Sequence, residues 1–539
     1  MRMFRRGTAI IAVSALAGVA LAACGQSKDS DNADSGDSGL SVGTTDKVVS
    51  IDPAGSYDNG SLTIQTQVYQ YLLNFPAGST ELTPDAAEAC DFDTPTTYVC
   101  TIKPGLTFAN GNELTASDVA FSFNRIVAIN DANGPASLLG NMKSVEATDD
   151  STVTFTLNNP NDQTFGQILV TSAGPIVDED TYPADKVLDD DAAVKAQGFS
   201  GPYTIGTYKK GQVAQFKANA DYDGAYNAPK TKEITLTTYS DTNNLKLDVQ
   251  NGKVDVAWRS LTPTDVESLG KDDKVKVHTG AGGELRYIVF NMKTMPGDDA
   301  AQKLAIRQAM ASSLDRDELS TEVYKGTYTP AYSAVPDGQV GAVESFKDKY
   351  GEKPDKAAAQ KFLDDAGVKT PVDIKLQYNT DHYGSSSTEE YNMVKRQLED
   401  SGLFTVDLQS TEYVTYSKER VDDAYPVFQL GWFPDFPDAD NYVTPFFAPN
   451  NFLQSHYNFS DDDNPVPEMT DLLTSEATDA DKDSRIATLK EIQDLVADQV
   501  PILPLLTGAQ VAVGGTDVEG LDETLDAAFK FRFTSLSKS

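Results

Sequence analysis

The sequence has few of the side chains that most often perform catalysis or bind metal ions. Among 539 residues there are three histidines and three cysteines, and His278, His382 and His456 lie far apart and near no cysteine. No phosphate loop ending in Gly-Lys-Ser/Thr and no His-Glu-x-x-His pair is present. Zinc and nickel sites rely largely on imidazole and thiolate ligands. We therefore expect no enzyme activity, no cofactor and no metal, although folding can bring distant histidines together.

Positive charge is also scarce. The chain has 44 Lys and Arg residues against 81 Asp and Glu residues, for a formal charge of −37. Nucleic acids and anionic lipid surfaces are held by basic patches, so this balance argues against both as partners. A strongly acidic chain slightly favours cationic or zwitterionic ligands, and it also keeps a protein soluble outside the cell.

Long apolar runs are missing as well. The longest run near the N-terminus, residues 7–20, follows three arginines and is too short for a confident membrane span. It ends in Leu21-Ala22-Ala23-Cys24-Gly25, which matches the bacterial lipobox. We predict a signal peptide over 1–23, lipid attachment at Cys24, and a flexible tether over 24–39 that contains one alanine and no larger apolar residue. The protein would then sit on the extracytoplasmic face of the cell membrane, attached only by its lipid.

The other two cysteines, Cys90 and Cys100, flank a short segment that contains Pro95 and resembles a hairpin turn. In an exported chain, two neighbouring cysteines favour a disulfide over two buried free thiols. Lipidation accounts for the odd cysteine, Cys24.

Apolar periodicity predicts an α/β fold, because helices and short apolar strands alternate through the second half of the chain. Nearer the start, a helix is predicted from Thr63 to Leu73, with a loop and cap at 58–61 in front of it. The strands are expected near 285–291, 372–378, 404–408 and 425–430, and the helices near 300–316, 355–366, 389–400 and 485–500.

One segment, 104–119, contains Pro-Gly-Leu-Thr-Phe, an Asn-Gly turn and Leu-Thr-Ala-Ser-Asp-Val. This pattern resembles the signature of the family 5 extracellular solute-binding proteins, the peptide and nickel class that serves bacterial ABC importers. Shorter resemblances occur at 201–203, 251–256 and 304–316. The chain looks most like the oligopeptide- and dipeptide-binding lipoproteins of that family.

The resemblance implies a two-lobed α/β fold of the periplasmic-binding-protein kind, with a hinge and an extra inserted subdomain. A ligand would sit between the lobes and be buried when they close. We assign 40–74, 203–285 and 497–539 to lobe I, 75–202 to its inserted subdomain, and 286–496 to lobe II.

The stretch from Gly431 to Tyr442 is the densest local mixture of aromatic and acidic residues in the chain. It contains Pro434 and Pro437, so it should form a loop after the strand at 425–430. In family members that bind peptides, a Trp-x-x-Asp loop pairs with the α-amino group of the ligand. The resemblance therefore makes Asp435 the candidate amine anchor.

Further site residues follow from the same resemblance. Trp432 is the aromatic of the motif, and Gly431 and Phe433 are candidates for pairing with the ligand's main chain. Asp438 and Asp440 are rivals of Asp435 for the amine. The opposite wall of the site is expected at Asn59, Gly60 and Ser61.

The leading hypothesis is a monomeric, lipid-anchored receptor that captures oligopeptides and delivers them to permease subunits with their ATPases. Recognition of main-chain groups would tolerate many side chains. A sugar receptor is one alternative, because Trp432, Phe433 and Tyr442 could stack on sugar rings. A secreted peptidase is the other.

Overall fold

A computed structural model describes residues 39–259, 261–380, 382–384, 386–448 and 467–539. Residues from Ser38 to the C-terminus form one compact unit. The predicted signal peptide, the lipid attachment at Cys24, the tether up to residue 38 and His456 lie outside the described residues. Within the described ranges, no helix has both the length and the apolar character needed to cross a bilayer.

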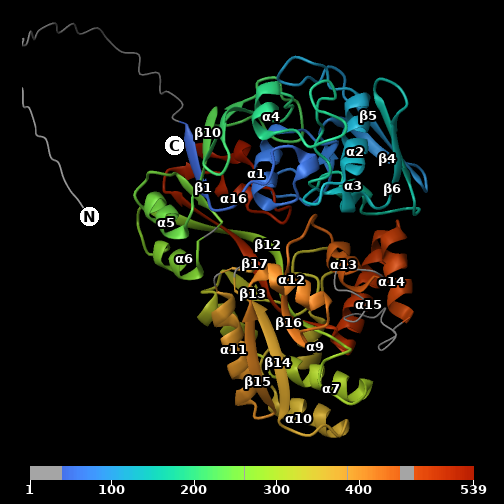
Figure 1. Cartoon of the computed structure of the whole chain (residues 1–539), viewed down its shortest axis with the longest axis vertical. Helices are drawn as coiled ribbons and strands as arrows, with labels where there is room; N and C mark the ends of the chain where they lie inside the picture. The colour runs from blue at the N-terminus through green and yellow to red at the C-terminus, as the bar shows by residue number, and fades with distance from the viewer. Residues whose placement is uncertain (1–38, 260, 381, 385, 449–466) are drawn as a thin grey trace, which may run out of the picture. The chain divides into compact units, whose positions relative to one another are not determined.

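An eleven-stranded mixed sheet runs through this unit, and its two longest strands lie in the middle (Figure 1). Long antiparallel β12 pairs with β17 along nearly its whole length, and β1 pairs in parallel with β10. The strand order is β15 (Phe404–Thr411), β14 (Val372–Asn379), β16 (Val427–Trp432), β12 (Val275–Phe290), β17 (Ile502–Gly515), β11 (Val256–Trp258), β1 (Leu40–Thr44), β10 (Glu233–Thr238), β9 (Val213–Ala218) and β8 (Tyr203–Lys209), with β13 (Tyr328–Pro330) beside β17.

Two separate hydrophobic cores form at the two ends of this sheet. The core of the first lobe includes Leu40, Phe216 and Phe533, and the core of the second includes Phe290, Tyr391 and Phe428. Helices of the first lobe are α1 (Asn59–Val68), α4 (Asp190–Ala196), α5 (Thr242–Gln250), α6 (Pro263–Leu269) and α16 (Leu521–Thr524). Helices of the second are α7 (Ala300–Ala311), α8 (Arg316–Glu318), α9 (Ser345–Tyr350), α10 (Lys356–Asp365), α11 (Ser387–Asp400), α12 (Tyr413–Val421), α13 (Thr444–Phe447), α14 (Pro467–Thr478) and α15 (Lys482–Gln499).

Strands β12 and β17 belong to both lobes. In β17, Leu503 and Leu506 pack in the second core, whereas Ala512 packs in the first. The register between the two strands breaks from Gly280 to Glu284. These strands therefore connect the lobes, and the boundary between lobes falls inside β17. Our division at 497 stays a prediction, and the residues just after it pack with lobe II.

A third core belongs to a segment between the strands of the first lobe. Its four-stranded antiparallel sheet packs against α2 (Ala116–Ile129), whose Thr115 and Asp118 form a capping box. Cys90 and Cys100 lie opposite each other on neighbouring strands and are joined by a disulfide. The sheet has the order β4 (Ala87–Thr94), β5 (Thr97–Ile102), β7 (Thr152–Leu157) and β6 (Met142–Ala147), and the short helix α3 is Phe165–Ile168.

The alternation of helices and strands in the second half of the chain is confirmed. Three local predictions are wrong. The helix expected over 300–316 ends at Ala311, and Gly431 and Trp432, expected in a loop, end strand β16. Helix α1 begins at Asn59 rather than Thr63 and ends at Val68. The side chain of Asp58 accepts the backbone N–H of Ser61 at 2.9 Å, so Asp58 is the N-cap and residues 59–61 are the first helical turn. They do not form a loop.

Replacing both Cys90 and Cys100 by alanine should lower the free energy of unfolding by about 2–3 kcal/mol, because the bond closes a loop that limits the unfolded chain. Urea denaturation of the oxidised protein and of the double variant measures the difference. Equal stabilities, or alkylation of both thiols in the native unreduced protein, would contradict the pairing.

Candidate functional site

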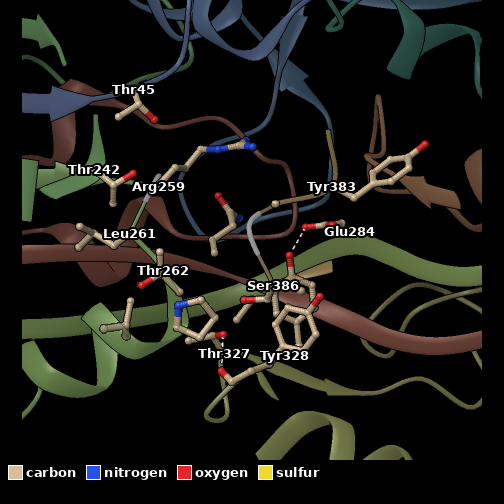
Figure 2. A pocket seen from close by; sticks show the side chains of 18 of the residues that line it. Thr45, Thr242, Arg259, Leu261, Thr262, Glu284, Thr327, Tyr328, Tyr383 and Ser386 are labelled. Atoms are coloured by element: carbon tan, nitrogen blue, oxygen red, sulfur yellow. Dashed lines mark hydrogen bonds between the residues drawn. The ribbon is translucent and has the colours of Figure 1, made fainter. Parts of the chain in front are cut away.

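A cavity of about 630 Å³ lies where the two lobes and the connecting strands meet (Figure 2). One wall follows β1 and β11 of the first lobe, and the floor is formed by β12 and β17. The other wall comes from the second lobe. The residues that carry its chemistry are Thr45, Asp46, Trp258, Arg259, Glu284, Tyr324, Tyr328, His382, Tyr383, Phe433, Gln510 and Phe529.

A buried charge cluster forms the floor on the β12 side. Arg286 is 1% exposed and binds Glu390 through Nε at 3.0 Å and Nη2 at 2.5 Å. Its Nη1 also lies 3.3 Å from Glu284, whose carboxylate accepts the Tyr328 hydroxyl at 2.5 Å, as Figure 2 shows. A buried ion pair of this kind is costly to break, because removing one partner leaves the other charge desolvated.

Arg259 projects from the end of β11 with a left-handed backbone, φ 56°. Its Nε lies 3.4 Å from Asp46, and its guanidinium lies 5.8 Å from the centre of the Phe433 ring. Phe433 follows β16 of the second lobe, so this cation–π contact joins the two lobes across the cavity. A strained residue at a cavity wall is typical of functional sites.

Phe433 is the one residue of the predicted Trp-x-x-Asp loop that lines the cavity. Trp432 instead packs edge-on against Phe446, with ring centres 5.3 Å apart, and its Nε1 donates to Asn441 at 3.2 Å. Gly431 lies in β16 opposite Arg286 and packs against the ring of Tyr383. Neither Gly431 nor Trp432 lines the cavity, and their contacts instead fix the position of the loop.

Asp435 lies two residues beyond Phe433 and is only partly buried. Its carboxylate is hydrogen-bonded by the hydroxyl of Tyr57 and by the Asn441 side chain, and its backbone N–H donates to Asn441 Oδ1 at 2.9 Å. Desolvation raises the pKa of Asp435, and the hydrogen bonds from Tyr57 and Asn441 partly oppose this shift. A ligand cation beside this carboxylate would lower its pKa again.

The contact from the first lobe to this loop comes from Tyr57 rather than from the predicted wall. Gly60 and Ser61 are buried in the first turn of α1, where the Ser61 hydroxyl accepts the backbone N–H of Val49 at 2.9 Å. Asn59 begins that same turn. An aromatic residue directly before the cap was the available signal for Tyr57, and sequence reasoning missed it.

The two rivals of Asp435 are already occupied. Arg485 donates to Asp438 at 3.0 and 2.7 Å and to Glu476 at 3.0 Å, and Gln167 donates to Asp438 at 2.9 Å. Asp440 accepts from the Thr444 hydroxyl. Burial and the neighbouring Asp440 raise the pKa of Glu476 to about 10, and Arg485 opposes this shift. Burial also raises the pKa of Asp440.

The geometry can now be compared with known proteins. The family model for bacterial extracellular solute-binding proteins, family 5 (middle), matches residues 81–454, more than half of the chain. The chain belongs to this family. The predicted family and the two-lobed α/β fold are thereby confirmed.

The sequence is also similar to bacterial peptide-binding proteins. The oligopeptide-binding protein OppA of Bacillus subtilis is 24% identical, with 89% of this chain and 90% of that protein covered. Di/tripeptide-binding protein 1 of Pseudomonas aeruginosa is 26% identical, with 81% and 83% covered. In fold, the chain is similar to the ABC transporter substrate-binding protein CtaP of Listeria monocytogenes, with TM-score 0.77, 24% identity, and 93% and 99% of the two chains covered.

The cluster around Arg485 generates a pH prediction. Folded Glu476 keeps its proton up to a pKa of about 10, whereas the unfolded residue loses it near 4.5. The free energy of unfolding should therefore fall as pH rises between these values, by up to about 1.4 kcal/mol per unit from this residue. In Glu476→Gln this contribution disappears, so stability should depend less on pH.

Urea denaturation at pH 5.5, 7.0 and 8.5 compares wild type, Glu476→Gln and the control Glu468→Gln. Glu468 is an exposed residue of the same helix, so its variant should follow the wild-type slope. Identical slopes for wild type and Glu476→Gln would show that Glu476 is ionised in the folded protein.

Proposed function

We propose that the protein is a lipid-anchored receptor that captures oligopeptides outside the cell membrane and delivers them to an ABC importer, without cutting them. The observation that carries this proposal is Asp435, a carboxylate that is hydrogen-bonded by Tyr57 and Asn441 and follows two residues after Phe433 of the cavity wall. The relatives point the same way, since OppA of Bacillus subtilis is an oligopeptide-binding protein and the Pseudomonas aeruginosa relative is a di/tripeptide-binding protein.

The chemistry of a peptide terminus suits this position. An ammonium group offers three donors, and a carboxylate can accept about four hydrogen bonds, so Asp435 can hold both Tyr57 and a ligand amine. Main-chain groups near Phe433 would then meet the ligand backbone. Since Tyr57 comes from the first lobe and Asp435 from the second, amine binding at this point favours the closed arrangement of the lobes.

A sugar receptor is less well supported. Of the three aromatic residues considered for stacking on sugar rings, only Phe433 lines the cavity. Tyr442 is fully buried and donates its hydroxyl to Gly283 O at 2.7 Å, and Trp432 packs against Phe446. A peptidase remains the other competitor. Incubation with a peptide mixture separates the three, because a receptor retains peptides intact, a sugar receptor retains none and a peptidase cuts them.

Membrane attachment is proposed from the lipobox at Cys24. Cys24→Ala removes the thiol that would carry lipid, so the variant should be released from the membrane fraction or remain unprocessed. Fractionation of cells followed by mass measurement checks this outcome. A membrane-bound variant with correct processing would contradict lipidation at Cys24.

The main test concerns Asp435. Asp435→Asn is nearly isosteric and should weaken binding of a free peptide by at least about tenfold, equivalent to about 1.4 kcal/mol, because a charge-assisted hydrogen bond is lost. N-acetylating the peptide should weaken binding to the wild type similarly. The two changes together should reduce the binding free energy by little more than either change alone, since both remove the same contact.

Calorimetric titration of both proteins with both peptides measures this cycle. Asp348→Asn, which removes an exposed carboxylate on α9, is the matched control and should bind like the wild type. Losses that simply add would show that Asp435 does not meet the amine.

A further inference from the structure

We propose that the cavity selects ligands with a positively charged side chain, an ammonium or a guanidinium, through Glu284 and Gln510. This inference rests on the proposed peptide-binding function and adds the side-chain class that the site prefers. It concerns a different part of the site from Asp435. The argument depends on the charge, the hydrogen bonds and the strand positions of the two residues.

Glu284 shares its positive partner with a second carboxylate. Among the described residues, Arg286 is the positive group that contacts Glu284, through a single contact of 3.3 Å, whereas it makes three contacts of 2.5–3.2 Å with Glu390. The cluster thus contains two carboxylates and one guanidinium. Tyr328 gives Glu284 a hydrogen bond but no charge. Because a buried charge is stable only when it is paired, a cation arriving from the cavity would complete this cluster.

The strand opposite Glu284 leaves its carboxylate open to the cavity. Glu284 in β12 pairs with Gly508 in β17, and both residues line the cavity. A Cβ at Gly508 would lie 3.0 Å from Glu284 Oε2 and 2.8 Å from the ring of Tyr328. Any side chain at position 508 would therefore crowd the carboxylate, and glycine keeps the space beside it free.

Gln510 adds a second acceptor on the same side of β17. Residues two apart on a strand point to the same face, so Gln510 follows Gly508 toward the cavity. Its Nε2 donates to the backbone carbonyl groups of Ala281, at 2.9 Å, and Asp526. Those two acceptors fix which amide atom is nitrogen. The remaining atom, Oε1, is buried and has no hydrogen-bond partner among the described residues.

Two acceptors with spare capacity, one of them charged, match a group that has several donors and positive charge. A lysine ammonium has three N–H donors and an arginine guanidinium has five. Arg259, a positive residue of the cavity wall, lies 3.4 Å from Asp46 and over the ring of Phe433, so its charge is paired within the wall. The acceptor end of the cavity is therefore the place for a basic side chain.

The test uses tripeptides that carry either lysine or norleucine at one position in turn, since norleucine keeps most of the aliphatic chain and removes the charge. The wild type should bind the lysine peptide at least about tenfold more tightly at one of the positions, by calorimetric titration. In Glu284→Gln the ratio of the affinities for the lysine and norleucine peptides should fall below about threefold. Glu284→Asp, which keeps the charge, should retain the preference for lysine.

Glu267→Gln is the matched control, because Glu267 is an exposed residue of α6 outside the cavity, and it should keep the wild-type ratio. Asp435→Asn should weaken the binding of all of the peptides but leave unchanged the ratio of the affinities for the lysine and norleucine peptides. If Glu284→Gln does not fold, two other measurements still decide the question. One is the ratio of lysine to norleucine affinities in the wild type and in Glu284→Asp. The other is whether acetylation of the lysine side chain abolishes the preference.

The outcomes separate the two proposals. A wild type that binds no peptide refutes the proposed function. A wild type that binds peptides without preferring lysine at any position, or a preference that survives in Glu284→Gln, refutes the role of Glu284 while leaving peptide binding in place. A preference that falls in Glu284→Gln and remains in Glu284→Asp supports it.

Discussion

The pairing of β12 with β17 is the interaction on which the rest of the structure depends. Both strands pass from one hydrophobic core to the other, and their register breaks between Gly280 and Glu284. At the break the chains approach so closely that a Cβ on Gly282 would lie 1.3 Å from Gly508 O. The break therefore requires glycine, and it places Glu284 and Gln510 on the floor of the cavity. The same region also contacts the loop that contains Asp435, since Gly283 O accepts the Tyr442 hydroxyl.

Charged groups are buried on both sides of the β12–β17 pairing. Their partners distinguish a cluster that is balanced within the protein from carboxylates that could meet a ligand. Around Arg485, Asp438 and Glu476 share the guanidinium, and the raised pKa of Glu476 keeps that side chain protonated. The charges of this cluster are therefore balanced without a ligand. Asp435 and Glu284 each accept a hydrogen bond from a tyrosine hydroxyl, and Glu284 shares Arg286 with Glu390. Carboxylates in that condition beside a cavity are suited to bind a cationic ligand group.

Much of the fold could be predicted because it depends on local patterns. The helices α7, α10, α11 and α15 have apolar faces that are visible in the sequence, and the motif at 104–119 indicated the family. The hydrogen bonds that Asp438 makes with Arg485 could not be predicted, since Arg485 lies 47 residues away. Glu284 and Gln510 were missed because the cavity that they line is built from strands far apart in the sequence, whereas Tyr57 had a local signal. The start of α1 was misjudged because Asn, Gly and Ser are typical of loops, whereas here Asp58 caps them into a helix.

The central claim is that a peptide lies between the lobes with its amine at Asp435, and a crystal structure of the protein with a bound tripeptide tests it most directly. The account predicts that the ligand nitrogen lies within about 3 Å of the Asp435 carboxylate, the distance of a charge-assisted hydrogen bond, and that the peptide backbone passes Phe433 into the cavity above β12 and β17. A peptide bound with its amine away from Asp435, or outside this cavity, would contradict the account.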